Sequence, residues 1–276
     1  MKFLETWRGR SGFAAEAPGM KRLVLALLGS VVFASNAAAS MVGVTPSNLQ
    51  GWGAQQWYFD GTNYTNTGSG ASSGITTTYA RSGLGSAQIK LADEGTSEAD
   101  WYYELPTPSA LANLTALGFD WYRSSSSTAP AWIAPALALY VESTNKSAYV
   151  IWEAAYNGFS GSVPADTWTT SNVLDNMFWS TCGGSWELKT LAEFNTSCFG
   201  GDGSVSYLTT FLGFGYTGTT FDGAVDNVTL GFGTAPATVF NFEPDAASVP
   251  EPASILLVGT CLAAAVGARR RRARRA

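Results

Sequence analysis

The sequence predicts an all-β fold: an antiparallel β-sandwich or jelly roll with one or two short helices, between an N-terminal signal helix and a C-terminal transmembrane helix. Short runs in which apolar and polar residues alternate recur from residue 52 to residue 242, and segments rich in Gly, Ser, Asn and Thr separate them. Such alternation places one set of side chains on each face of a strand. The chain has no spacing typical of parallel βαβ units and no glycine-rich phosphate loop, which argues against an α/β fold.

Residues 1–39 form the first of three predicted segments, a signal peptide region. Basic residues at Lys21 and Arg22 precede the apolar run Leu23–Ala34, and Ala37-Ala38-Ala39 follows. A basic start, a short apolar stretch and an Ala-x-Ala site are typical of a secretory signal peptide that is cleaved after Ala39. The first nineteen residues do not fit in front of this pattern, so we expect translation to begin at Met20. A retained membrane anchor is the alternative.

The second segment, the body at residues 40–248, has the size of one large all-β domain. Its alternating runs, in chain order, are Ala87, Ile89 and Leu91; Leu117, Phe119 and Trp121; Leu137, Leu139 and Val141; Val150 and Trp152; Phe214 and Tyr216; Val228, Leu230 and Phe232; and Phe240 and Phe242. Two stretches have a helical pattern instead. Ser109–Leu117 predicts a brief turn, and Trp186–Phe194 predicts a surface helix with Ser185 as its N-cap.

The charge and the residue types of the body exclude several functions. Its five basic and eighteen acidic residues give a net charge of −13, which the terminal arginines mask in the whole-chain value of −5. A body this acidic repels nucleic acid and anionic lipid. The chain contains no histidine, so it cannot form a Ser-His-Asp triad, a Cys-His pair or a His-ligated zinc site.

The body contains two cysteines, Cys182 and Cys198. Export places them in a compartment where disulfides persist, so we expect a bond that closes the predicted surface helix into a loop. Two free thiols are the alternative. The third cysteine, Cys261, lies in the apolar part of the tail.

The third segment, the tail at residues 249–276, combines three environments. Pro250, Glu251 and Pro252 predict a stiff, extended and accessible strap. The apolar run Ala253–Ala268 spans roughly 24 Å as a helix, somewhat less than the ~30 Å bilayer core. A cluster of arginines then marks a cytoplasmic end: Arg269, Arg270, Arg271, Arg272, Arg274 and Arg275. A buried core helix followed by a solvated basic end is the alternative.

The order and spacing of these three parts resemble the PEP-CTERM sorting signal of Gram-negative bacteria. The resemblance covers the tail only. It implies that Pro250, Glu251 and Pro252 are recognised by a membrane-embedded, cysteine transpeptidase-like exosortase that cuts nearby. It also implies an exported protein that is an inner-membrane intermediate and then reaches the cell surface or extracellular matrix, alongside exopolysaccharide and biofilm.

A second resemblance concerns Phe221–Phe232, together with Thr190–Phe194 and Asn241–Pro244. These segments are similar to the ends of exported PEP-CTERM sandwich proteins, and the acidic-Asn-Val strand is similar to carbohydrate-binding-module and galactose-binding-like jelly rolls. In several such families a carboxylate near the last strand helps to hold a structural calcium ion. The resemblance therefore implies Asp222 and Asp226 as calcium ligands, and no other cofactor.

Tryptophans near turn residues are the candidate sugar-binding groups, because an exposed indole stacks on the apolar face of a sugar ring. The candidates are Trp52, Trp57, Trp101 and Trp132; the alternative is that they close the open edges of a sandwich. Carboxylate pairs suited to glycoside hydrolysis also occur: Glu98 with Asp100, Glu104 with Asp120, and Asp222 with Asp226.

We therefore expect a non-catalytic surface or matrix protein, with an exosortase-type enzyme and extracellular polysaccharide as its partners. A secreted carboxylate-dependent glycan hydrolase or lyase is the alternative, and a structural matrix protein without a specific ligand is the second alternative. Among eighteen acidic residues close pairs arise by chance, so the carboxylate pairs alone do not predict an enzyme.

Overall fold

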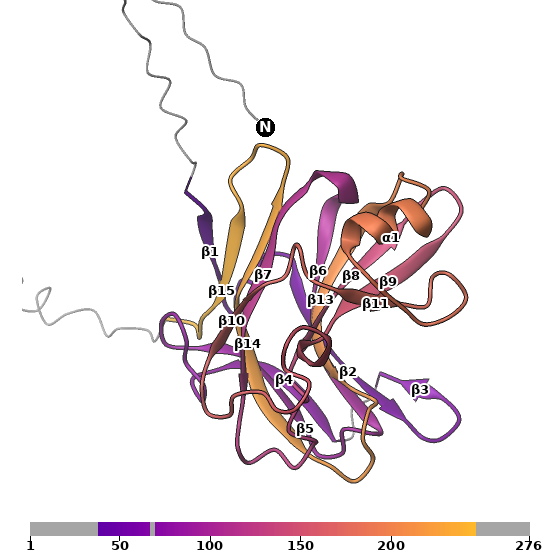
Figure 1. The fold of residues 1–276 in the computed structure, drawn as a ribbon. Helices are drawn as coiled ribbons and strands as arrows, with labels where there is room; N and C mark the ends of the chain where they lie inside the picture. Colours follow the sequence, from indigo (N-terminus) through magenta and orange to yellow (C-terminus); the bar gives the residue numbers. More distant parts are fainter. Residues whose placement is uncertain (1–37, 67–69, 247–276) are drawn as a thin grey trace, which may run out of the picture. The chain divides into compact units, whose positions relative to one another are not determined.

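The computed structural model describes residues 38–66 and 70–246, in which fifteen strands form two sheets that pack face to face (Figure 1). The predicted all-β sandwich is confirmed. The predicted signal helix and transmembrane helix lie outside the described residues. Within the described residues, no helix is long and apolar enough to cross a bilayer.

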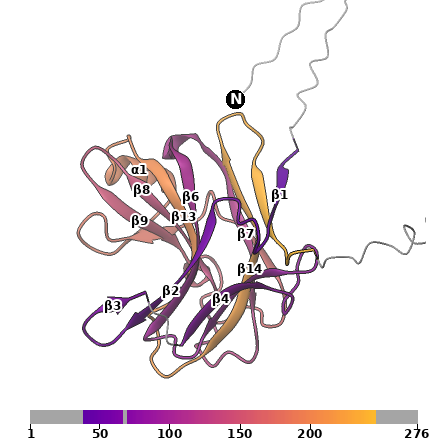
Figure 2. The ribbon, with the colours of Figure 1, turned by 180° about the vertical axis from the view of Figure 1, so that it is seen from behind.

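The first sheet, here the β14 sheet, is built around the long strand β14. Its strands are β1 (Ser40–Val44), β4 (Ala71–Thr76), β5 (Ser86–Leu91), β7 (Leu114–Arg123), β10 (Thr169–Asn172), β14 (Phe221–Phe232) and β15 (Thr238–Phe242). One edge of β14 pairs with β7, whereas β5 and β15 share the other edge. β1 pairs with β15 in parallel, with Ser40 opposite Thr238. Figure 2 shows this sheet from behind.

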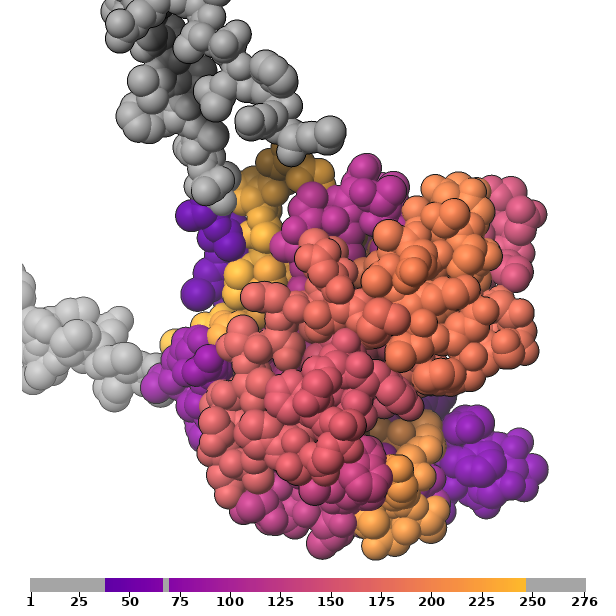
Figure 3. Space-filling view, viewed as in Figure 1, coloured from indigo at the N-terminus to yellow at the C-terminus, as the bar shows by residue number. Residues whose placement is uncertain are grey.

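The second sheet, here the β13 sheet, has the strand order β12-β11-β9-β8-β13-β6-β2-β3. Its strands are β2 (Trp52–Phe59), β3 (Tyr64–Thr65), β6 (Ser97–Ala110), β8 (Ala136–Glu142), β9 (Ser147–Trp152), β11 (Phe178–Ser180), β12 (Glu187–Lys189) and β13 (Ser204–Gly213). All pairs in it are antiparallel. The space-filling view shows that the residues between β9 and β10 form a broad part of the surface on one side of the sandwich (Figure 3).

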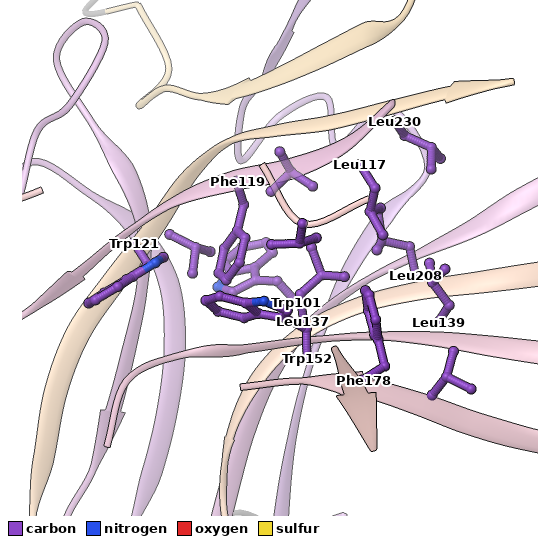
Figure 4. Packing of buried hydrophobic residues seen from close by; sticks show 14 of the residues in the cluster. Trp101, Leu117, Phe119, Trp121, Leu137, Leu139, Trp152, Phe178, Leu208 and Leu230 are labelled. Atoms are coloured by element: carbon purple, nitrogen blue, oxygen red, sulfur yellow. The ribbon is translucent and has the colours of Figure 1, made fainter. Parts of the chain in front are cut away.

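The core lies between the two sheets and contains most of the apolar residues that the alternation predicted (Figure 4). Phe119 of β7 and Trp152 of β9 meet edge to face at 5.4 Å between ring centroids, so the two sheets contact each other directly through aromatic rings. Aromatic pairs in this geometry stabilise a core by ~0.5–1.5 kcal/mol beyond the area they bury.

Three short helices interrupt the strands: η1 (Leu111–Asn113), η2 (Ala154–Tyr156) and α1 (Leu191–Ser197). The helix predicted over Trp186–Phe194 begins later, because Thr190 and Glu193 form a capping box that fixes the first turn at Leu191. Ser185 is exposed in the preceding loop, and residues 187–189 form β12. The predicted turn over Ser109–Leu117 shortens to η1, because β6 continues to Ala110.

One further difference concerns the end of β13, whereas the predicted disulfide is present. Phe214 has a φ of 56°, which ends β13, and Tyr216 lies in the following loop rather than on a strand. Cys182 and Cys198 form a disulfide with 6.0 Å between their Cα atoms. Cys198 caps the C-terminus of α1, so the bond joins that helix to the loop after β11.

Candidate functional site

A groove runs across the outer face of the β13 sheet. On β6, Ala99 and Trp101 point into the core, so Glu98 and Asp100 point outward. These two carboxyls and residues from β2, β8, β9 and β13 line a cavity of about 320 Å³. The lining residues of this cavity are Gln55, Trp57, Glu98, Asp100, Ala138, Tyr149, Ile151, Tyr207, Thr209 and Phe211.

A second hollow of about 540 Å³ shares Tyr149 and Ile151 with the first and is also lined by Trp179 of β11. Trp179 pairs with Ile151 across the two strands, so the hollows are continuous over β9. We call the two together the groove. It crosses the strands from β2 to β11, which is a shape suited to an extended ligand.

Tyrosine rings form much of the groove surface. Tyr207 of β13 stacks on Tyr102 of β6, with 5.4 Å between centroids and 14° between planes. Tyr149 meets Tyr207 at its edge and is 45% exposed. Gly53 of β2 faces Tyr102: a Cβ at this position would lie 2.3 Å from Cζ of the ring. A side chain here would therefore force the Tyr102 ring to shift from its stacked position.

The two carboxyls of the groove have different protonation. Burial raises the pKa of Glu98 to about 8, and the charge of neighbouring Asp100 adds to the rise. Burial raises the pKa of Asp100 to about 6, although hydrogen bonds from the Gln55 N–H, at 3.0 Å, and from Trp57 lower it. At neutral pH the groove therefore presents a protonated carboxyl that can donate beside a carboxylate that accepts.

The structure places the four predicted tryptophans in different environments. Trp52 and Trp101 are each only 3% exposed, so the prediction that they present rings to solvent is wrong. Both rings pack on Phe242 in the core, at 5.0 and 5.4 Å between centroids. Trp57 lines the groove. Trp132 is 37% exposed and lies in a loop outside the groove.

The predicted calcium ligands do not come together. Asp222 accepts a hydrogen bond from Gln88 at 2.8 Å and lies 3.8 Å from the amino group of Lys90. Asp226 is fully buried and accepts from the backbone N–H groups of Phe242 at 2.9 Å and Ser82 at 3.3 Å. Across the residues that the structure describes, no three His, Cys, Asp or Glu side chains form a group that could hold a metal ion.

Of the predicted carboxylate pairs, only Glu98 and Asp100 lie together in a cavity. Glu104 is exposed on β6, whereas Asp120 lies on β7 in the other sheet, 2.8 Å from the Nε atom of Arg81. The tyrosines of the groove were not predicted as site residues. Their only sequence signal is that Tyr102 and Tyr149 each neighbour a buried residue, Trp101 or Val150, and so face outward.

The tail of the chain matches a known sorting motif. Residues 248–272 match the PEP-CTERM protein-sorting motif. This chain carries a PEP-CTERM sorting signal. The match confirms the predicted motif around Pro250, Glu251 and Pro252, which lies outside the described residues together with the terminal arginines. A protein with this motif is exported and passes through the membrane for sorting to the cell surface.

The body is similar to several solved structures. A family 11 carbohydrate-binding module of a cellulosomal cellulase from Clostridium thermocellum has 11% identity and a TM-score of 0.36, over 71% of this chain and 91% of that one. The same module from that organism in complex with a β-1,3-1,4-mixed-linked tetrasaccharide has 10% identity and a TM-score of 0.34, over 63% and 86%.

A glycoside hydrolase domain of Endo-D from Streptococcus pneumoniae has 14% identity and a TM-score of 0.28, over 63% of this chain and 20% of that one. No curated protein sequence matches the chain significantly. Because all three TM-scores lie below 0.5, the assignment of the fold depends on the two sheets of this structure.

Proposed function

We propose that the exported body binds a polysaccharide in the groove and acts without catalysis at the cell surface or in the extracellular matrix. The observation that carries this proposal is the convergence of aromatic rings and hydrogen-bonding carboxyls in one elongated hollow. Trp57, Tyr149 and Tyr207 offer apolar surface to sugar rings. Glu98 and Asp100 offer a donor and an acceptor to sugar hydroxyls.

The charge of the groove favours a neutral polysaccharide. The described lining of its deeper part includes two acidic residues and no Lys or Arg, and Lys146 lines only the outer hollow. The body carries five basic and eighteen acidic residues, so it repels a polyanion over its whole surface. Uronate-rich or sulfated chains should therefore bind poorly.

The sorting signal supports a location at the cell surface for this activity. An exosortase-type enzyme would process the chain at the inner membrane, and the body would then contact extracellular polysaccharide, as in a biofilm. Because six of the sixteen basic residues of the chain lie in the tail and five lie in the signal peptide region, processing would leave a strongly acidic surface protein.

Retention on immobilised polysaccharide tests the proposal. The mature protein recovered from producing cells should be retained on mixed-linkage β-glucan or xylan more than on alginate, with and without a calcium chelator. Trp57→Ala should weaken binding about tenfold or more, because it removes a ring from the groove. Trp168→Ala, a partly exposed indole beside Tyr122 on the other sheet, is the matched control. Failure of the wild-type protein to bind any polysaccharide would contradict the proposal and favour a structural matrix protein.

The groove also favours a second candidate, glycan hydrolysis. Glu98 and Asp100 are two residues apart on one strand face, and their pKa values of about 8 and about 6 differ as those of an acid and a base do. Their Cα atoms lie ~6.6 Å apart along the strand, so both carboxyls reach the same part of the groove, as the paired carboxylates of a glycosidase must. The wild-type protein would then release reducing ends from a polysaccharide, and Glu98→Gln and Asp100→Asn would each abolish that release. This result would replace the binding proposal with hydrolysis.

A further inference from the structure

Four exposed aromatic rings gather outside the groove. Trp132, Tyr156, Trp186 and Tyr216 are 37%, 43%, 51% and 41% exposed, respectively. Trp132 and Tyr216 are 6.1 Å apart between centroids, and Tyr156 and Trp186 are 5.6 Å apart. The two pairs are neighbours, since Tyr216 is close enough to help raise the pKa of Tyr156, after the larger effects of burial and Glu153. We call these four residues the aromatic ledge.

The ledge begins where the groove ends. Trp179, at the outer end of the groove, donates from Nε1 to Oε1 of Glu153 at 2.8 Å. Glu153 directly precedes η2, whose last residue is Tyr156. In Figure 3 the segment around residue 155 borders the orange segment that carries Trp186. One hydrogen-bonded pair therefore joins the outer end of the groove to the segment that carries Tyr156.

The loops that carry the ledge are held in place by specific hydrogen bonds. The buried carboxylate of Glu94 accepts from the N–H of Tyr216, and Asp93 accepts from the N–H of Gly218 at 3.0 Å. Asn157, next to Tyr156, donates to the carbonyl of Met177 at 2.9 Å and accepts from its N–H at 3.0 Å. The backbone on which Tyr156 and Tyr216 stand is therefore already fixed and loses little entropy when a ligand binds.

We propose that the ledge is a second contact surface for the same polysaccharide chain, which fills the groove and continues over the four rings. The proposal rests on the function proposed above. The face of an exposed aromatic ring can accept the apolar face of a sugar. The ring planes differ by 78° within the Trp132–Tyr216 pair and by 57° within the Tyr156–Trp186 pair, so the rings would contact a chain at separate positions rather than as one flat platform. A short oligosaccharide would occupy the groove alone, whereas a polymer would contact both surfaces and bind more tightly because the second contact is intramolecular.

The double variant Tyr156→Ala with Trp186→Ala tests this, with Leu84→Ala as an exposed apolar control, since Leu84 is 71% exposed. Titration of the mature protein would compare a trisaccharide with its parent polymer, using the polymer that retains the wild-type protein best. The double variant should lose about tenfold in polymer affinity and keep its trisaccharide affinity. The Leu84→Ala variant should match the wild type for both probes.

Three results would contradict the proposal that the ledge binds the polysaccharide. Equal polymer binding by the variant and the wild type would show that the rings do not contact the ligand, while the groove proposal stands. Equal losses for trisaccharide and polymer would make the rings part of the groove itself. A wild-type dimer that the double variant dissociates, measured by sedimentation, with unchanged sugar binding, would make the ledge a self-association surface. Absence of wild-type retention on any polysaccharide, by contrast, is failure of the proposed function.

Discussion

Glu98 is the residue whose ionisation most directly links the groove to the stability of the protein. Its carboxyl is enclosed on the outer face of the β13 sheet beside Asp100. Ionising it requires a charge to lose water and to approach a second carboxylate. The folded protein therefore holds this proton to about pH 8, whereas the unfolded chain releases it near the ordinary value of 4.5.

The sign of the resulting pH dependence follows from this difference. Because the pKa is higher in the folded state, the folded protein binds the proton more tightly, and the free energy of unfolding falls as pH rises from about 4.5 to about 8. Glu98→Gln removes the charge at every pH. We expect the variant to match the wild type near the acid end of this window and to melt at a higher temperature above its alkaline end.

Thermal unfolding across the window checks this prediction. Asp100 contributes a smaller fall of its own, since its pKa is raised only to about 6. The control is Glu104→Gln, on the same strand but exposed to solvent, which should leave the pH profile unchanged. Parallel profiles for Glu98→Gln and the wild type would show that Glu98 ionises normally.

At the scale of elements, the disulfide fixes an edge of the β13 sheet that has few strand pairs. β12 has three residues and pairs with β11 alone, and α1 follows it directly. Cys182 lies before β12 and Cys198 ends α1, so the bond closes both elements into one loop with a sequence separation of 16. The loop is therefore held at both ends rather than by strand pairing only.

Removal of the bond should destabilise the protein through the unfolded state. Cys182→Ser with Cys198→Ser frees a loop of this length, which corresponds to ~3 kcal/mol in the chain-entropy model. Urea unfolding of the mature protein measures the loss. Wild-type protein in excess reductant should show the same unfolding midpoint as the double variant, and an unchanged midpoint in both would mean that the loop is fixed by its packing alone.

The alternation of apolar and polar residues predicted most of the core, because it distinguishes buried from exposed side chains wherever one face of a strand contacts solvent. The prediction was wrong at Trp52 and Trp101, because nearby glycines and acidic residues suggested exposed turns. Both indoles are in fact buried. Pro106 and Pro108 concealed the length of β6, which runs through both prolines to Ala110. Proximity to turn residues therefore does not predict exposure.

The groove could not be predicted from alternation at all. It exists because β13 lies between β6 and β8, which brings Asp100 close to Tyr207 and Tyr149 although these residues are far apart in the sequence. Strand order depends on long-range pairing, which no local pattern specifies. Glu98 and Asp100 could be predicted as a carboxylate pair from local sequence, because both lie on one strand. Of the predicted pairs, only this one lies in a cavity.

At the scale of the whole molecule, the sorting signal follows the folded body with little intervening chain. Glu243 donates its N–H to the carbonyl of Val44 at 2.8 Å, and Asp245 accepts from the N–H of Ser47 at 3.0 Å. The matched motif begins at residue 248. At ~3.5 Å for each extended residue, the chain between Asp245 and Pro250 reaches less than ~20 Å. An enzyme that recognises Pro250 would therefore bind close to the body.

We expect recognition by the processing enzyme to depend on the Pro-Glu-Pro sequence. Pro250 and Pro252 predict an extended backbone that an enzyme can bind with little loss of entropy, and Glu251 supplies the charge between them. Pro250→Ala with Glu251→Ala should therefore leave a precursor of full length in the membrane fraction, detected by immunoblotting after cell fractionation. Pro108→Ala, at an exposed proline of β6, should be processed as the wild type is. Normal release of the double variant would mean that the apolar run and the arginines are sufficient for sorting.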